Sequence, residues 1–278
     1  MRLDAVISNA VSRLSDRSDS ARLDAEILLC QAINKPRSYL FAHPEDELDE
    51  LTHNRFEKHL QRRIKGEPVS YITGKREFWS HNFLVSPATL IPRPETELLV
   101  DLALQMIPHD SDWQILDLGT GSGAIAISIA AERLMCKVTA TDISPDALAI
   151  AQKNGRQAKL SNLIFLNGDW TTPVIGKSFN IIISNPPYLA EDNEALMELH
   201  CEPQKALTSG ADGLDDIRIL ARDCADILSQ DGWLMMEHGI DQAHDVANIL
   251  KAESWTDIIC HNDLSGRPRV TVARQNGK

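Results

Sequence analysis

Residues 115–123 read ILDLGTGSG, an apolar run that ends in a loop with three glycines at alternate positions. A helical pattern follows at 123–134. A strand, a glycine loop and a helix in this order are typical of a nucleotide-binding turn in a doubly wound sheet, because glycines let the backbone approach a ligand closely. The stretch therefore predicts an α/β domain with a cofactor site at Gly119, Thr120, Gly121, Ser122 and Gly123.

Strand and helix patterns alternate around this loop. Short apolar runs predict strands at 113–118, 137–142, 163–167, 179–184 and 233–237. Helical or loop segments separate the first four, which implies right-handed crossovers and a parallel sheet with helices on both faces. Two further runs, 257–261 and 269–273, flank a turn-like segment and predict an antiparallel hairpin added to this sheet.

The amino-terminal part has a different pattern. Apolar residues recur at helical spacing within 3–14, 20–34 and 49–65, which predicts a small helical bundle. In the second segment the spacing points to Leu23, Ile27 and Leu28 as the inner face. The third segment turns most of its basic residues outward: Lys58, Arg62, Arg63 and Lys65.

The two parts meet at a short aromatic and β-branched run. Residues 76–86 predict a hairpin, and Pro94 suits the first position of the helix that follows. We therefore expect a helical domain at 1–75, a hairpin linker at 76–90 and the α/β domain at 91–278.

Composition places the chain among folded proteins with a sizeable core, since 278 residues contain 43% hydrophobic and 24% charged residues. No apolar run approaches the ~18 residues of a membrane span, and Asp4 interrupts the amino-terminal stretch where a signal peptide is apolar. We expect a cytoplasmic protein without membrane contact. The five cysteines are widely spread without a C-x-x-C pair, which favours reduced packing residues over a metal or redox site.

The net charge of −12 is unevenly distributed. Residues 1–85 carry 13 basic and 13 acidic side chains, so the whole excess lies in the later part of the chain. An acidic protein is poorly suited to binding nucleic-acid phosphates. We therefore do not expect a nucleic-acid substrate.

Acidic residues near the strand ends are candidate cofactor ligands. Asp142 lies 23 residues after Gly119, where a carboxylate can accept hydrogen bonds from both ribose hydroxyls of either NAD or S-adenosylmethionine. A helix cap is a second interpretation of Asp142, although Ser144 is better placed for that role. Asp117 favours the methyl donor, because a carboxylate there can meet an ammonium group. Asp169 and Trp170 follow the third strand and are candidates for holding adenine.

The segment from Asn185 to Tyr188, NPPY, is the most specific feature of the chain. Neither proline has an N–H to donate, and both restrict the residue before them to extended backbone. The Asn185 side-chain oxygen and the Pro186 carbonyl can each accept one hydrogen of a planar NH₂ group, while the Tyr188 ring stacks on its face. A hydroxyl or thiol leaves one acceptor unmet, at a cost of about 1–3 kcal/mol. The motif therefore predicts that the reacting group of the substrate is an NH₂ nitrogen, bound by Asn185, Pro186, Pro187 and Tyr188.

An amide or nucleobase nitrogen is a poor nucleophile because its lone pair is delocalised. Holding both hydrogens turns the lone pair toward a sulfonium methyl, and alignment of the two centres lowers the barrier further. No strong general base is needed, since the methylated cation is acidic enough to lose its proton to water. We expect Asn185, Pro186 and Tyr188 to be the catalytic residues.

Together these segments resemble the peptide chain release factor glutamine methyltransferases, the HemK-type family of class I S-adenosylmethionine-dependent methyltransferases. The resemblance runs nearly end to end, through REFW, LIPRPETE, LDLGTGSG, ATDIS, NGDW, SNPPY, CEPQKAL, SGADGLD and GRPRVTVAR. The glycine loop and NPPY are shared with DNA adenine and some RNA methyltransferases. LIPRPETE is the discriminating segment, because the similar ribosomal-protein glutamine methyltransferases depart from it after Ile-Pro-Arg.

The resemblance implies a Rossmann-like, seven-stranded, mostly parallel sheet with a small helical domain that docks the substrate. It implies transfer of methyl from S-adenosyl-L-methionine, leaving S-adenosyl-L-homocysteine, to the side-chain amide nitrogen (N5) of the glutamine in the Gly-Gly-Gln motif of release factors. The donor site is then Gly119 to Gly123 with Asp142, Trp170 and Asn185, and the acceptor site is Asn185 to Tyr188.

Two other functions stay open at this point. One is a ribosomal-protein glutamine methyltransferase, and the other is a nucleic-acid amino methyltransferase of the adenine N6 type, which the net charge disfavours. Arg93, Glu95 and Glu97 also match the family pattern, but the start of a helix accounts for them nearly as well, so their role is open.

Overall fold

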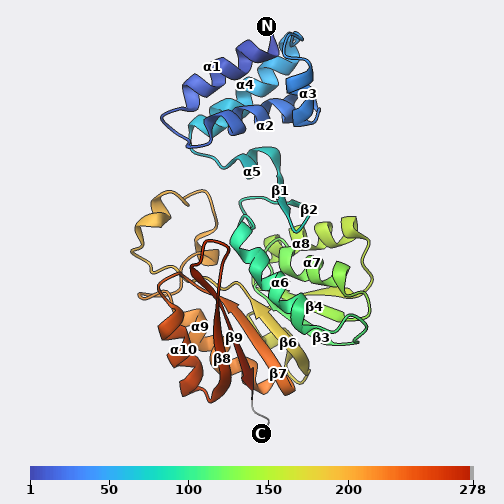
Figure 1. Ribbon diagram of the computed structural model, residues 1–278, viewed down its shortest axis with the longest axis vertical. Helices are drawn as coiled ribbons and strands as arrows, with labels where there is room; N and C mark the ends of the chain where they lie inside the picture. The colour runs from blue at the N-terminus through green and yellow to red at the C-terminus, as the bar shows by residue number, and fades with distance from the viewer. Residues whose placement is uncertain (276–278) are drawn as a thin grey trace. The chain divides into compact units, whose positions relative to one another are not determined.

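The computed structural model describes residues 1–275, and the chain divides into two compact units, Met1–Lys75 and Arg76–Lys278 (Figure 1). The predicted α/β domain extended to residue 278, and its last three positions, 276–278, lie outside the described residues. No helix within residues 1–275 is long and apolar enough to cross a membrane.

The first unit is entirely helical. Its helices are α1 (Leu3–Leu14), α2 (Ala21–Ile33), α3 (Arg37–Ala42), α4 (Glu50–Ile64) and α5 (Val69–Thr73). The three predicted helices are present, and α4 begins where the Asp49 side chain accepts a hydrogen bond from the Thr52 N–H (2.8 Å). Helices α3 and α5 were not predicted, because 6 and 5 residues are too few for a periodic pattern.

The inner face of α2 agrees with the prediction only in part, since Leu28 is buried and Ile27 is half-buried, but Leu23 is not. Leu23 is 41% exposed, whereas Asp24 and Glu26 are buried on the core side. Each buried carboxylate has a cationic partner: Asp24 pairs with Arg63 (2.8 Å), and Glu26 pairs with Arg37 (2.6 Å). Paired charges can replace apolar side chains at buried positions, so spacing alone misplaced Leu23 and did not reveal the two acidic positions.

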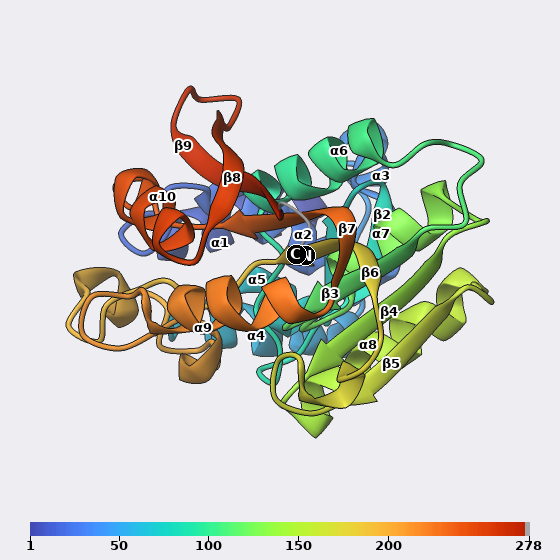
Figure 2. The same cartoon turned by 90° about the horizontal axis from the view of Figure 1, so that it is seen from below.

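The second unit is a seven-stranded sheet with helices on both faces, as predicted (Figures 1 and 2). Its strands are β3 (Gln114–Leu118), β4 (Lys137–Asp142), β5 (Leu163–Asn167), β6 (Phe179–Ser184), β7 (Leu228–Glu237), β8 (Trp255–Asn262) and β9 (Pro268–Gln275). Their order is β5-β4-β3-β6-β7-β9-β8. The first five strands in this order are parallel, and β9 pairs antiparallel with both β7 and β8.

The helices of the second unit are α6 (Glu97–Met106), α7 (Ala124–Glu132), α8 (Pro145–Ala158), α9 (Asp215–Asp223) and α10 (Ala243–Ala252). Short 3₁₀ turns lie at η1 (Pro94–Thr96), η2 (Thr172–Val174), η3 (Glu194–Met197), η4 (Gln204–Ala206) and η5 (Cys224–Asp226).

Two apolar cores sandwich the sheet. In β6, Ile181 and Ile183 pack with α6 and α7, whereas Ile182 packs with α9 and α10. A strand buried on both faces reads as a continuous apolar run, which explains why β6 was predicted without an alternating pattern.

The position of β3 defines where a ligand site can form. Its neighbours are β4 on one side and β6 on the other, and Leu118 lies opposite both Thr141 and Ser184. The chain leaves β3 toward one side of the sheet and reaches the other side only later, so a crevice opens beyond these carboxyl ends.

The predicted hairpin is present as β1 (Lys75–Phe78) and β2 (His81–Leu84). Phe78 and Phe83 pack edge to face, with ring centroids 6.1 Å apart. Asn154 of α8 connects the hairpin to the glycine loop, because it bonds the Leu84 N–H (2.8 Å), the Leu84 carbonyl (3.0 Å) and the Ser122 carbonyl (2.8 Å).

Replacing Asn154 by Ala should destabilise the second unit by about 1–3 kcal/mol, since buried backbone groups lose their partners. All five tryptophans lie between residues 79 and 255, so urea unfolding followed by tryptophan fluorescence reports on this unit. Asn248→Ala, at a position on α10 whose bond to His244 is exposed, is the matched control. Equal unfolding midpoints for the two variants would contradict the structural role of Asn154.

Candidate functional site

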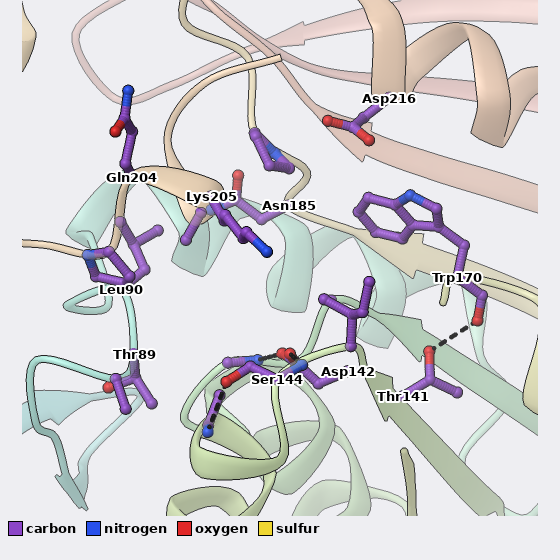
Figure 3. A pocket seen from close by; sticks show the side chains of 18 of the residues that line it. Thr89, Leu90, Thr141, Asp142, Ser144, Trp170, Asn185, Gln204, Lys205 and Asp216 are labelled. Atoms are coloured by element: carbon purple, nitrogen blue, oxygen red, sulfur yellow. Dashed lines mark hydrogen bonds between the residues drawn. The ribbon is translucent and has the colours of Figure 1, made fainter. Parts of the chain in front are cut away.

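A pocket of about 560 Å³ opens at the carboxyl ends of the central strands (Figure 3). Asn185 and Lys205 lie across it from Asp142 and Ser144, with Thr89 and Leu90 on one side and Trp170 and Asp216 on the other (Figure 3). The remaining lining residues are Ala88, Gly119, Gly121, Thr141, Ile143, Ala147, Asp169, Pro187, Pro203, Gln204, Ala206 and Thr208.

The glycine loop forms the floor of the pocket. Gly119 and Gly121 have φ values of 71° and 57°, in the left-handed region that side chains disfavour. A Cβ atom on Gly119 would lie only 3.1 Å from the Trp170 ring. The loop is attached to β4, because the Gly119 N–H bonds the Thr141 carbonyl (3.0 Å).

Asp142 holds the same loop with its carboxylate. Oδ2 accepts from the Gly121 N–H and Oδ1 from the Ser144 N–H, both at 2.8 Å. Burial raises the pKa of Asp142. The helix cap itself is Ser144, whose Oγ accepts from the Ala147 N–H (3.2 Å). Each oxygen of Asp142 keeps a second lone pair for a hydroxyl donor in the pocket.

Asp117 lies behind the loop and does not line the pocket. Its side chain is 1% exposed; Oδ2 accepts from the Thr120 hydroxyl (2.6 Å), and Oδ1 has no hydrogen-bond partner within residues 1–275. Burial raises the pKa of this carboxyl to about 7. An orphaned buried carboxylate oxygen is a site for a cationic or protonated partner.

Three other loop residues act within the protein. The Thr120 hydroxyl donates a hydrogen bond to Asp117, and the Ser122 carbonyl accepts one from Asn154. Gly123 is the N-cap of α7 and has a φ of 84°. None of the three lines the pocket. The glycine motif therefore identified the loop, while only Gly119 and Gly121 of its five residues face the ligand space.

Asp169 and Trp170 both line the pocket, beyond the end of β5. Trp170 has φ 39°, and its carbonyl accepts from the Thr141 hydroxyl (3.1 Å), which fixes this unusual backbone. The indole ring packs against Gly119, so the segment after β5 and the glycine loop form one continuous wall.

Asn185 and Pro187 of NPPY line the pocket, whereas Pro186 and Tyr188 do not. The Asn185 Nδ2 group donates to the Thr96 hydroxyl (3.1 Å), and its Oδ1 accepts no hydrogen bond from the described residues. The acceptor oxygen of the side chain is therefore the atom left for a ligand.

The Tyr188 ring lies deeper than expected. Its hydroxyl donates to Glu237 Oε1 (3.2 Å), and its carbonyl accepts from the Gln242 side chain (2.9 Å). Burial is the main cause of its raised pKa. The ring supports the NPPY segment from behind in this arrangement.

A second wall was missed by the sequence reasoning, although its segments were noted as motifs. Residues 88–90 and 203–206 face the ligand space from LIPRPETE and CEPQKAL or next to them. Glu202 joins the two segments, because it accepts from the Ile91 N–H (3.0 Å) and from the Arg93 guanidinium. This ion pair gives Arg93 a structural role. Glu97 has one too, since its carboxylate accepts from the Trp79 N–H (2.9 Å).

Comparisons with known proteins agree with this geometry. Residues 5–74 match the PrmC N-terminal domain, and residues 96–213 match the methyltransferase small domain. The release factor glutamine methyltransferase of Coxiella burnetii is 42% identical over 96% of both chains, and that of Xylella fastidiosa is 44% identical over 92% of this chain and 94% of the relative. A methyltransferase from Pyrococcus furiosus shares the fold, with a TM-score of 0.53, 17% identity and coverage of 80% of this chain and 100% of its own.

The fold and the pocket at its switch point are those of a methyltransferase with a Rossmann-like sheet. Near full-length similarity above 40% identity narrows the class further. The chain belongs to the family of release factor glutamine methyltransferases.

The raised pKa of Asp117 makes stability depend on pH. The folded state keeps a proton up to about pH 7, whereas the unfolded chain releases it near its ordinary pKa of 3.8. The contribution of Asp117 to the free energy of unfolding is therefore complete below pH 3.8 and is lost as the pH rises toward 7. In Asp117→Asn, the free energy of unfolding should decrease less between pH 5 and pH 7.5 than in the wild type. Urea titrations check this, with Asp146→Asn on the exposed face of α8 as control. Parallel pH profiles for wild type and Asp117→Asn would contradict the assignment.

Proposed function

We propose that the protein transfers a methyl group from S-adenosyl-L-methionine to the side-chain amide nitrogen of the glutamine in the Gly-Gly-Gln motif of release factors. The observation that carries this proposal is the Asn185 side chain, which faces the pocket with its oxygen unengaged while Thr96 holds its nitrogen. An acceptor at this place selects a hydrogen-bond donor beside the glycine loop.

The residues around the loop fit the methyl donor. Two lining residues suit the methyl donor, since the spare lone pairs of Asp142 suit the ribose hydroxyls and Asp169 suits the amino group of adenine. Asp117, whose Oδ1 is orphaned behind the loop, is our proposed partner for the ammonium group. When bound, the donor supplies a methyl group on a positively charged sulfur. The Asp142 carboxylate in the pocket lining favours a cationic ligand over an anionic dinucleotide.

On the substrate side, the reaction depends on how the glutamine amide is held. Asn185 Oδ1 takes one hydrogen of the glutamine NH₂ group in this proposal, and the carbonyl of Pro186, which adjoins the lining residues Asn185 and Pro187, takes the other. The nitrogen lone pair is then free to face the methyl group. The methylated amide is acidic enough to lose its proton to water. Positioning of the two reacting centres then supplies the acceleration.

A protein substrate fits the charge of the chain better than a nucleic acid does. The net charge is −12, and the acidic excess lies after residue 85, in the unit that holds the pocket. Phosphate backbones require basic surfaces. The names of the relatives point in the same direction, and because release factors act in translation we place the reaction in the cytoplasm.

We further propose that the helical unit docks the release factor. Much of its basic surface is neutralised internally, since Arg62 pairs with Glu67 (2.5 Å) and Arg63 with Asp24 (2.8 Å). Lys58 and Lys65 of α4 and its C-cap are exposed and form no ion pair within residues 1–275. These two lysines are the part of the predicted basic face that remains available to an acidic partner.

Asn185→Ala should lower kcat for a Gly-Gly-Gln peptide by about 100-fold or more, because a hydrogen bond that orients the reacting nitrogen is lost. The dissociation constant of S-adenosyl-L-methionine should change far less. Isotope-labelled methyl donor and mass spectrometry of the peptide measure the transfer and locate the methyl group.

Asn248→Ala is the control, since this residue lies on α10 outside the pocket. Full turnover in Asn185→Ala would contradict the acceptor role. Label found on another residue, or on nucleic acid from a lysate, would contradict the proposed substrate.

Reversing the charge of both Lys58 and Lys65 to Glu should raise KM for an intact release factor without raising KM for the short peptide, because the proposed docking contacts involve parts of the release factor that the peptide lacks. Steady-state kinetics with the two substrates measure the effect. Equal changes in both KM values would remove the docking role.

A further inference from the structure

Gln242 is a polar residue behind the NPPY segment, and neither the sequence motifs nor the pocket lining includes it. It is the N-cap residue of α10, in the short segment that follows β7. Its side-chain Oε1 accepts from the Gly239 N–H (2.8 Å), and its Nε2 donates to the Tyr188 carbonyl (2.9 Å). One side-chain amide therefore joins the end of NPPY to the segment between β7 and α10.

The two hydrogen bonds of Gln242 fix the direction in which its amide faces. Only the amide oxygen can accept from the Gly239 N–H, and only the NH₂ group can donate to a carbonyl. Within residues 1–275 the Tyr188 carbonyl accepts no other hydrogen bond. Gln242 is thus the donor on which this carbonyl depends.

Gly213 covers the bond between Gln242 and Tyr188. It is buried, and its φ of 76° lies in the left-handed region. A Cβ atom at this position would lie 2.3 Å from the Tyr188 carbonyl oxygen and 3.0 Å from Gln242 Nε2. Such close backbone contact shields the bond from water, and a bond in these surroundings is costly to lose.

The backbone of NPPY has few free rotations of its own. The two proline rings fix φ at Pro186 and Pro187, and each ring restricts the residue before it to extended backbone. The rotations that stay free lie after the Pro187 ring, up to the Tyr188 carbonyl. The place where this carbonyl is held therefore affects the orientation of the whole segment.

The sheet fixes the other end of the segment. Ser184 is the last residue of β6, and it pairs with Leu118 of β3 and with Met236 of β7. Asn185 and the Pro186 carbonyl, which hold the glutamine amide in the proposed reaction, lie between this end and the carbonyl that Gln242 binds.

We propose that Gln242 is a positioning residue for methyl transfer, which holds the Tyr188 carbonyl so that the Asn185 oxygen and the Pro186 carbonyl face the pocket. The inference rests on the proposed amide methylation and adds to it a residue outside the pocket lining. The methyl donor should be little affected, because the glycine loop and Asp142 belong to β3 and β4 rather than to NPPY.

The test compares Gln242→Met and Gln242→Glu in the full-length protein. Methionine keeps the length of the side chain but makes neither bond. Glutamate can still accept from the Gly239 N–H and has no donor for the Tyr188 carbonyl. In both variants kcat for a Gly-Gly-Gln peptide should fall about 10- to 100-fold, the scale of misplacing a reacting group, while the dissociation constant of S-adenosyl-L-methionine stays within about threefold.

Gln105→Met is the matched control and should keep the wild-type kcat. Gln105 of α6 is exposed and bonds Asp101 one turn earlier in the same helix (2.8 Å). A wild-type kcat in both Gln242 variants, or a loss confined to KM, overturns the positioning role. A kcat that falls in Gln242→Met and is restored in Gln242→Glu overturns it too, because the Gly239 bond would then be the one that matters.

A second measurement needs no turnover. Of the three tyrosines, Tyr39 and Tyr188 are the two that precede a leucine. Tyrosine labelled with ¹³C at the carbonyl and leucine labelled with ¹⁵N therefore give two correlated signals, and Tyr188→Phe identifies the one that belongs to Tyr188. This ¹³C signal should move upfield in both Gln242 variants, because the carbonyl loses its donor.

An unchanged carbonyl signal in both variants overturns the inference. Failure of the wild type to methylate the peptide overturns the proposed function instead, and the carbonyl signal still decides whether Gln242 holds the NPPY segment.

Discussion

The parallel pairing of β3 with both β4 and β6 is the constraint on which the site depends. Leu118 stands opposite Thr141 and Ser184, so the next residues of each strand emerge side by side. A slip of one residue would exchange the two faces of a strand, and the apolar cores on both sides of β6 oppose it. The register of these strands therefore places the glycine loop, Asp142 and NPPY around one pocket.

Buried polar contacts then join segments that are far apart in the chain. Glu202 connects the two segments of the second wall, Asn154 connects the hairpin to the glycine loop, and Thr96 connects the start of α6 to Asn185. Each connects a loop to a regular element or to another loop. Loops that carry function are held in one conformation when their polar groups are satisfied in this way.

The strands and the glycine loop were predictable because their signals are local. The run FNIIIS predicted β6 with its observed bounds, and the glycine spacing predicted the loop. The inner face of α2 was predicted only in part, since the buried position of Asp24 depends on its ion pair with Arg63 from another helix. The burial of Glu237 gave no local signal either, because its hydrogen-bond partner Tyr188 comes from a distant segment. Periodicity describes one element at a time, whereas partners for buried charges are chosen by the tertiary structure.

The double hydrogen bond of Asp142 has a thermodynamic consequence. Its two oxygens accept hydrogen bonds from the Gly121 and Ser144 amides, both at 2.8 Å, so contacts within the protein itself hold the loop. The loop is thus preorganised, and little conformational entropy is lost in it when a ligand binds. Substituting Asp142 alters the ligand-free loop as well as the complex, so a measured change in affinity combines a lost contact with a loop that must be ordered anew.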